Sequence, residues 1–367
     1  MTANGPSIAP DVVALGESMV TFVPSRPGRL ADVPSFERGI GGAESNVVCM
    51  LAAAGHRVRW VSRVGADGFG DHLVERIGAY GVDVSAVERD PERPTGIYFR
   101  TAQDRASRGH EVAYYRAGSA ASAMAVGNTD LGAVRAGRVL HLSGITAALS
   151  DDCLGLVREL TAPRAGRPLV SFDVNHRPGL WRDPDGPRVL LELARRADIV
   201  FVGADEARRA WGLHGARAIR DALPEPEIVV VKQGRGGAVA LDSDCDGIED
   251  ASGTATFVRA LSVDVVAAVG AGDAFAAGFL SATLRGLPVR DRLRHGHLMA
   301  AATLTVPGDL ADLPAATAAE GSPSRRASWL DHTDRLAALD DAGWERLRLG
   351  PGWTEAALRA DEEVPTP

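Results

Sequence analysis

The sequence predicts a doubly wound α/β protein, a three-layer αβα sandwich with a small β-sheet lid. Three observations predict it. Short Val- and Ile-rich segments alternate with longer helical patterns along most of the chain, as in parallel sheets that are buried on both faces. Gly-rich turns follow several of these segments, at the edge where such sheets bind ligands. One segment near residue 100 alternates residue by residue instead, as a small exposed sheet does.

Six short apolar segments are expected to form the strands of the main sheet. They are residues 12–15, 58–61, 139–142, 169–172, 199–202 and 228–231. Their length and β-branched composition favour strands over helices. Because the chain between them is long enough for helices, right-handed crossovers and a parallel sheet follow.

Helical patterns are expected in the chain between these strands. They cover residues 43–54, 70–80, 154–160, 188–195 and 273–284. The segment 93–119 interrupts the pattern, because residues 96–101 and 111–116 alternate as strands do. We expect these residues, with strands near 20–40, to form the lid.

The most informative motif is Gly-Ala-Gly-Asp at residues 270–273, at the start of an Ala-rich helix. The unpaired N–H groups and the positive end of a helix attract phosphate, and glycine lets the backbone approach a ligand. Asp273 lies where a hydroxyl group could lose its proton. On these residues alone, a simple strand-to-helix turn with an Asp cap is an equal interpretation.

Further motifs share the order and spacing of one family. They are residues 41–46 (GGAESN), 65–70 (GADGFG) and 232–237 (KQGRGG). With these motifs the chain resembles the PfkB, or ribokinase-like, family of sugar kinases from about residue 12 to residue 309. Residues 95–100, 114–120, 141–146 and 173–177 are similar to its 2-keto-3-deoxygluconate kinase branch. The resemblance implies a ribokinase-like sandwich over residues 11–310.

The resemblance also implies a mechanism, in which the γ-phosphoryl group of ATP moves in line to the 6-hydroxyl of 2-keto-3-deoxygluconate. Asp273 accepts the hydroxyl proton, and position matters more than basicity if the proton leaves late. Backbone N–H groups of Gly270, Ala271 and Gly272 stabilise the phosphoryl oxygens, and Mg²⁺ bridges the phosphates.

The substrate residues that the resemblance implies come from the first helix, the lid and two later segments. They are Gly42, Ala43, Glu44, Ser45, Asn46, Tyr98, Tyr114, Arg116, Arg177 and Asp309. Arginine suits the carboxylate of a sugar acid because its guanidinium makes two parallel hydrogen bonds. Taken alone, each of these arginines is expected to be a solvated surface residue, since the chain has many arginines; the resemblance reverses that expectation.

The nucleotide is expected to bind Asn175, Lys232, Gly234, Gly237, Gly270, Gly272 and His297. Lys232 is the only lysine of the chain, and its compact ammonium group can neutralise phosphate without fixed fork geometry. Glu206 matches the acidic residue that organises the metal indirectly through its waters.

The chain departs from the family pattern in three places. Ala267 and Ala268 replace Asp-Thr or Asp-Pro, so the sequence gives no support to a monovalent-cation site. Gly203 replaces an Asn ahead of Glu206, and His297 replaces an Asn beside the adenine. The metal assignment and the preference for ATP depend on these positions.

The charge and composition of the chain indicate which classes of partner to expect. The formal net charge of -8 argues against nucleic acid. The first ten residues lack the pattern of a signal peptide and no apolar segment reaches membrane-spanning length, so we expect a cytoplasmic protein without a membrane partner. Cys49, Cys153 and Cys245 lack metal-site spacing and are expected to be reduced. A homo-oligomer is an expectation from the resemblance alone.

Residues 311–367 extend beyond the resemblance. Residues 321–326 are expected to be a linker, and an apolar stripe after it predicts a helix that packs on the body or on a second subunit. The stripe consists of Trp329, Leu336, Leu339, Trp344 and Leu347.

Two alternatives to 2-keto-3-deoxygluconate kinase stay open. One is a PfkB kinase for 2-keto-3-deoxygalactonate, 5-keto-2-deoxygluconate or fructose, since one epimeric hydroxyl changes few contacts. The other is a catalytically weak sugar-acid sensor. A dinucleotide-dependent oxidoreductase is excluded, because Gly16-Glu17-Ser18 after the first strand is not a Gly-x-Gly-x-x-Gly motif.

Overall fold

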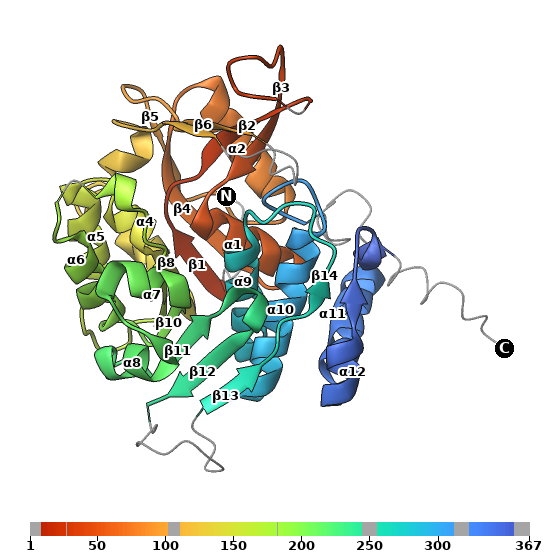
Figure 1. Ribbon diagram of the computed structural model, residues 1–367. Coiled ribbons are helices and arrows are strands. Elements are labelled where there is room, and N and C mark those ends of the chain that lie inside the picture. The colour runs from red at the N-terminus through yellow and green to blue at the C-terminus, as the bar shows by residue number, and fades with distance from the viewer. Residues whose placement is uncertain are drawn as a thin grey trace, which may run out of the picture.

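A nine-stranded sheet is the middle layer of the molecule in the computed structural model (Figure 1). The structure describes residues 9–26, 28–101, 111–181, 183–243, 255–311 and 323–355. The strand order is β13-β12-β11-β10-β9-β8-β1-β4-β5. The strands are β1 (Val12–Leu15), β4 (Val58–Gly65), β5 (Val87–Asp90), β8 (Val139–Ser143), β9 (Leu169–Asp173), β10 (Ile199–Gly203), β11 (Ile228–Lys232), β12 (Ala238–Asp242) and β13 (Ala255–Val258).

All six predicted strands occur in this sheet, and neighbours from β5 to β11 run parallel. Strands β12 and β13 differ from the prediction, since they extend the sheet on one side in antiparallel orientation, with β13 at the edge. The reason is local. A tight turn with Gly234 and Gly237 at positive φ joins β11 to β12, and so short a connection permits only antiparallel pairing.

Helices cover both faces of the sheet, as predicted. One face carries α1 (Ala43–Ala53), α2 (Gly68–Ala79), α9 (Ala271–Leu284) and α10 (Val289–Leu304). The other carries α5 (Asp151–Thr161), α6 (Gly186–Ala194), α7 (Ala204–Trp211) and α8 (Gly215–Ala222). Strand β1 shows why both faces are apolar: Val12 and Ala14 belong to one core, Val13 and Leu15 to the other. Three short segments, α3 (Leu131–Val134), α4 (Gly144–Ala147) and η1 (Ala120–Ala123), complete this layer.

The lid is a four-stranded sheet above the carboxyl ends of the main strands (Figure 1). Its order is β3-β2-β6-β7, with β2 (Met19–Pro24), β3 (Phe36–Gly41), β6 (Ile97–Arg100) and β7 (Val112–Tyr115). Stacked rings of Phe22 and Phe99, 4.8 Å between centroids, join its two halves. Residues 102–110 of the predicted lid lie outside the described residues.

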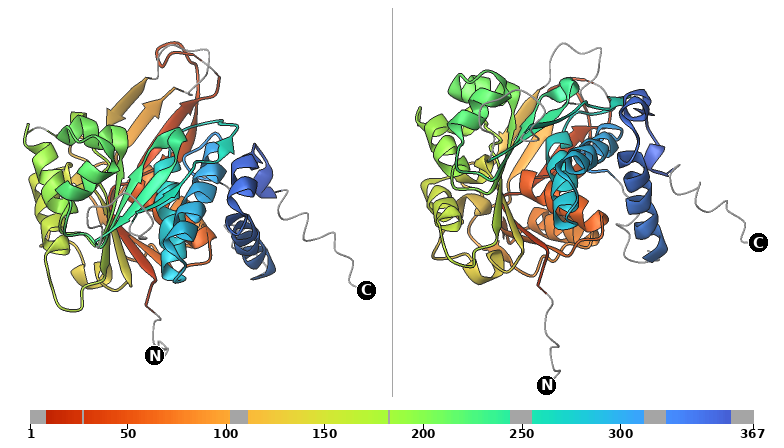
Figure 2. Two further views of the ribbon diagram at one scale, coloured as in Figure 1. Left: turned by 60° about the horizontal axis from the view of Figure 1, so that its bottom comes forward. Right: turned by 90° about the horizontal axis from the view of Figure 1, so that it is seen from below.

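The carboxyl-terminal segment packs on the outer side of α10, as Figure 2 shows. It consists of α11 (Pro323–Ala337), α12 (Asp341–Arg346) and β15 (Arg348–Leu349), and β15 pairs with β14 (Ser262–Val263). Helix α11 begins at Pro323, so the predicted linker over 321–326 is too long. Trp329 and Trp344 are buried in the same core as α9 and α10. None of the helices in the described ranges combines the length and apolarity needed to span a bilayer.

Candidate active site

A cavity of about 1200 Å³ lies at the carboxyl ends of the strands, below the lid. Segments far apart in the sequence line it: the start of α1, the lid strands, the loops after β9, β10 and β11, and the turn before α9. Ligands of open α/β sheets bind at this edge, because the loops that leave parallel strands meet there. The cavity is therefore the candidate active site.

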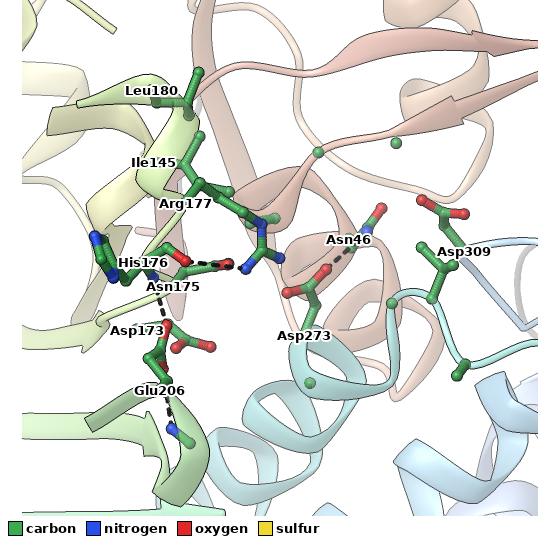
Figure 3. A pocket seen from close by; sticks show the side chains of 18 of the residues that line it. Asn46, Ile145, Asp173, Asn175, His176, Arg177, Leu180, Glu206, Asp273 and Asp309 are labelled. Atoms are coloured by element: carbon green, nitrogen blue, oxygen red, sulfur yellow. Dashed lines mark hydrogen bonds between the residues drawn. The ribbon is translucent and has the colours of Figure 1, made fainter. Parts of the chain in front are cut away.

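The turn at the start of α9 places Asp273 in the cavity wall (Figure 3). Gly270 caps α9 with φ of 74°, a left-handed conformation that glycine adopts without strain. A Cβ atom at this position would lie 2.1 Å from the carbonyl oxygen of Asp309. Asn46 donates from Nδ2 to Oδ2 of Asp273 over 2.9 Å. Glycine is thus required both by the turn and by its close approach to the segment at Asp309.

The environment of Asp273 prepares it to accept a proton. Burial is the largest effect and raises the pKa of its carboxyl group to about 7. The hydrogen bond from Asn46 acts in the opposite direction, Asp173 raises the pKa, and the Lys232 ammonium lowers it. A carboxylate with a pKa close to neutrality is well suited to general base catalysis.

Lys232, at the end of β11, brings a cation to the same turn. Its Nζ donates to Oδ2 of Asp173 over 2.8 Å, and a Cβ atom built on Gly272 would lie 3.5 Å from this nitrogen. Burial lowers the pKa of Lys232, but the charges of Asp173 and Glu206 outweigh burial, so the pKa is raised. The ammonium is therefore charged, beside the amino end of α9, where an anion is favoured.

Glu206 connects the end of β10 to the loop after β9 through hydrogen bonds. Its carboxylate accepts hydrogen bonds from the backbone N–H of Gly203, over 3.0 Å, and of His176. Burial is the main cause of its raised pKa, and Asp173 adds to it. Within the described ranges no cluster of three His, Cys, Asp or Glu residues is able to hold a metal ion. Glu206 lines the cavity as a carboxylate held by two backbone N–H groups.

The lid side of the cavity contains two buried ion pairs. Asp309 accepts from Tyr98 Oη over 3.0 Å and from Arg100 Nη2 over 2.9 Å. Glu17 pairs with Arg116 and accepts from Ser119 Oγ over 2.6 Å. The charge of Arg116, which the sequence assigns to the sugar acid, is therefore already matched by a protein carboxylate.

Most of the residues predicted for the site line this cavity. They are Gly42, Ala43, Asn46, Tyr98, Tyr114, Arg116, Asn175, Arg177, Glu206, Lys232, Gly234, Gly270, Gly272, Asp273 and Asp309. Figure 3 shows Arg177 extending into the cavity, toward Asn46 and Asp273.

The other predicted site residues do not line the cavity, among them Ala271, whose neighbours Gly270 and Gly272 do. Glu44 is fully buried and accepts hydrogen bonds from Ser143 Oγ and Thr146 Oγ1. The hydroxyl of Ser45 faces Ser18 Oγ at 3.0 Å.

Gly237 and His297 also lie outside the cavity lining. A Cβ atom on Gly237 would lie 2.3 Å from the carbonyl oxygen of Val258, so this glycine allows two backbones to pack closely. The ring of His297 is buried against Phe275 and Trp344. The carboxyl-terminal segment thus lies beside the residue that the sequence places at the adenine.

Sequence reasoning assigned no role to Glu17, Arg100, Asp173 or Arg209. Glu17 lies just after the end of β1, and Asp173 is the last residue of β9. Their positions at strand ends could therefore have identified them as candidates for the site. The residue-by-residue alternation of the lid segment could have identified Arg100. Nothing in the sequence distinguishes Arg209, because it is one of two adjacent arginines on α7.

The chain is similar to known proteins over most of its length. The model of the pfkB family of carbohydrate kinases matches residues 9–316. The 2-dehydro-3-deoxygluconokinase of Bacillus subtilis is 34% identical over 83% of this chain and 92% of its own length. The 2-dehydro-3-deoxygalactonokinase of Haloferax volcanii is 31% identical over 82% and 93%. A crystal structure of a PfkB protein from Polaromonas is 35% identical over 80% and 95%, with a TM-score of 0.71.

The cavity, the Gly-Ala-Gly-Asp turn and these similarities define a sugar kinase. The chain belongs to the pfkB family of carbohydrate kinases. It is accordingly a phosphotransferase that acts on an alcohol group, and the resemblance seen in the sequence motifs is confirmed.

Proposed function

We propose that this enzyme uses ATP to phosphorylate the 6-hydroxyl group of 2-keto-3-deoxygluconate. The observation that carries the proposal is the position of Asp273, which lies in the wall of a large cavity between the lid and the amino end of α9. The similarity to the Bacillus enzyme, at 34% identity, supports the sugar acid as substrate.

In the proposed reaction Asp273 accepts the proton of the attacking hydroxyl group. Its hydrogen bond to Asn46 fixes the carboxylate, so that the catalytic geometry exists before the substrate binds. Phosphoryl oxygens then lie at the N–H groups of the turn that includes Gly270 and Gly272, and Lys232 adds a positive charge. A Mg²⁺ ion bound with the nucleotide would neutralise further charge on the phosphates.

The sugar acid is proposed to lie between this turn and the lid. Tyr98 and Tyr114, with ring centroids 5.4 Å apart, form an aromatic wall on the lid side. Arg177 lies on the opposite wall, and within the described part of the chain no acidic side chain forms an ion pair with it. It is the better placed of the two predicted arginines for the carboxylate, because Arg116 pairs with Glu17.

One alternative has a specific observation in its favour. The Haloferax relative, named as a 2-dehydro-3-deoxygalactonokinase, covers the chain almost as fully as the Bacillus relative. The two sugar acids are epimers, and a single hydroxyl group changes few contacts.

The test is ADP release with ATP and Mg²⁺ across 2-keto-3-deoxygluconate, 2-keto-3-deoxygalactonate, 5-keto-2-deoxygluconate and fructose. We expect the highest kcat/KM with 2-keto-3-deoxygluconate and its loss in Asp273→Asn. Asp151→Asn is the matched control, since Asp151 occupies the first turn of α5, outside the cavity lining. Turnover with fructose alone would overturn the sugar-acid assignment, and binding of the keto acid without turnover with any of the four would favour a sensor.

A further inference from the structure

The outer end of the cavity is rich in arginine side chains. Arg209 and Arg235 line it, Arg177 extends toward the middle of the cavity, and all three are exposed. Among the residues that the structure describes, no carboxylate lies within 4.0 Å of their guanidinium groups. The sequence assigns Arg177 to the sugar acid and the segment of Arg235 to the nucleotide, but it gives no role to Arg209.

A direct neighbour shows what an ordinary surface arginine on this helix does. Arg208 lies beside Arg209 on α7, outside the cavity lining, and its Nη2 lies 2.9 Å from Oδ1 of Asp205. The chain contains 48 acidic residues against 40 basic ones, so carboxylates are abundant. An arginine that lines a cavity without one is available for an anionic ligand.

The topology brings Arg209 to the phosphate side of the cavity. Strands β10 and β11 are parallel neighbours, and Gly203 at the end of one lies opposite Lys232 at the end of the other. Arg209 is on the helix that follows β10, and Arg235 is in the turn that follows β11. Both therefore extend from the sheet edge that holds the Lys232 ammonium.

The electrostatic environment of His176 supports this placement. His176 lines the cavity between these elements, and its pKa is lowered first by burial, then by the charges of Arg209 and Arg177. The charge of Arg209 is therefore close enough to affect a side chain that lines the cavity.

The ligand that fits this end is a polyphosphate. A sugar acid brings one carboxylate, and Arg177 already faces the middle of the cavity (Figure 3). A nucleotide brings several phosphate charges, and a guanidinium fork matches two phosphate oxygens at once. We propose that Arg209, together with Arg235, binds the polyphosphate of the nucleotide and sets the affinity of the enzyme for it. The proposal rests on the kinase function, but not on the identity of the sugar.

The experiment measures equilibrium binding of Mg·ADP and of AMP by calorimetry, without sugar. The variants are Arg209→Ala, Arg209→Lys and, as the matched control, Arg208→Ala. We expect Arg209→Ala to weaken ADP binding about five- to twentyfold and AMP binding much less. Arg209→Lys should recover part of the affinity, and Arg208→Ala should stay within twofold of the wild type.

Steady-state kinetics separates this proposal from the proposed function. Arg209→Ala should raise the KM for ATP and leave the KM for the sugar unchanged. Wild-type affinity of Arg209→Ala for ADP would overturn the inference, and so would weaker binding of the phosphorylated sugar product alone. If no sugar of the panel is turned over while Arg209→Ala still loses ADP affinity, the proposed function fails and the inference stands.

Discussion

The two ends of the cavity differ in how their charges are matched. On the lid side, Asp309 pairs with Arg100 and Glu17 pairs with Arg116, and these side chains are nearly inaccessible to water. On the outer side, Arg209 has no acidic partner within the described ranges and is exposed. A buried charge without a partner is destabilising, because desolvation is costly. An exposed cation is solvated by water and needs no partner in the protein before a ligand binds.

This difference has a functional meaning for a kinase with two substrates. At the paired end the buried charges cancel in pairs, and we propose that sugar hydroxyl groups bind there through hydrogen bonds. The unpaired end attracts a highly charged ligand that binds and leaves in every cycle. The turn at Gly270 separates the two ends, with Asp309 on one side and Lys232 on the other.

The largest effect on stability is expected from breaking the paired end. Asp309→Asn leaves Arg100 buried without a counter-charge, and removal of one partner of such a pair costs about 3–5 kcal/mol. Urea unfolding measures this loss. The double variant with Arg100→Met should recover part of the free energy of unfolding. A loss below about 1 kcal/mol in Asp309→Asn would show that the pair is not needed for folding.

A smaller loss of stability is expected from a substitution in the turn at Gly270. Gly270→Ala puts a side chain into a left-handed conformation, which costs about 1–2 kcal/mol, and also against the carbonyl oxygen of Asp309. Gly286→Ala is the matched control, because Gly286 has φ of 71° but open space around it. Thermal unfolding should show the larger decrease in Gly270→Ala, together with lower kcat. Equal decreases in both variants would mean that the contact with Asp309 is unimportant.

The pH dependence of kcat/KM tests the role of the Asp273 carboxylate, which lies between the two ends of the cavity. Burial raises the pKa of Asp273 to about 7, and a base acts in its ionised form. The rate should therefore fall about tenfold for each pH unit below 7 and level off above it. Asn46→Ala removes the hydrogen bond that lowers the pKa of Asp273, so its profile should shift to higher pH. A flat profile from pH 5.5 to 8 would contradict this role of Asp273.

Added salt is expected to change the KM values of the two substrates by factors that differ a few-fold. Exposed charges are screened by ions much more than buried pairs are. Because a polyphosphate carries more charge than the one carboxylate proposed to bind Arg177, added NaCl should raise the KM for ATP more than the KM for the sugar. KCl should act as NaCl does, because Ala267 and Ala268 provide no side-chain oxygen for a monovalent cation. Equal increases in both KM values would weaken the distinction, and activation by KCl alone would reveal a cation site built without these side chains.

The sequence predicted the six central strands and the turn at Gly270 because both depend on local patterns. Val-rich segments between helices predict buried parallel strands, and two glycines before an Asp at a helix start predict a turn into the helix. The sequence analysis did not predict the antiparallel β12 and β13, whose pairing depends on the tight turn that joins β11 to β12.

The pairing of side chains could not be predicted in this way. Arg116 and Arg177 are both arginines at strand ends, and only the fold shows that Glu17 matches the charge of the first. Glu44 begins α1 in a Gly-rich motif, yet its side chain turns into the core toward Ser143 and Thr146. His297 is covered by Trp344 from a segment that lies beyond the family match.

The central claim, that Asp273 is the base of a sugar-acid kinase, is tested most directly by single-turnover phosphoryl transfer. Wild type and Asp273→Asn are mixed with ATP, Mg²⁺ and 2-keto-3-deoxygluconate, and the 6-phosphate is followed by mass spectrometry. The variant should bind both substrates, yet transfer the phosphoryl group about 10²- to 10⁴-fold more slowly than the wild type. Transfer at the wild-type rate by Asp273→Asn would contradict the assignment of the base.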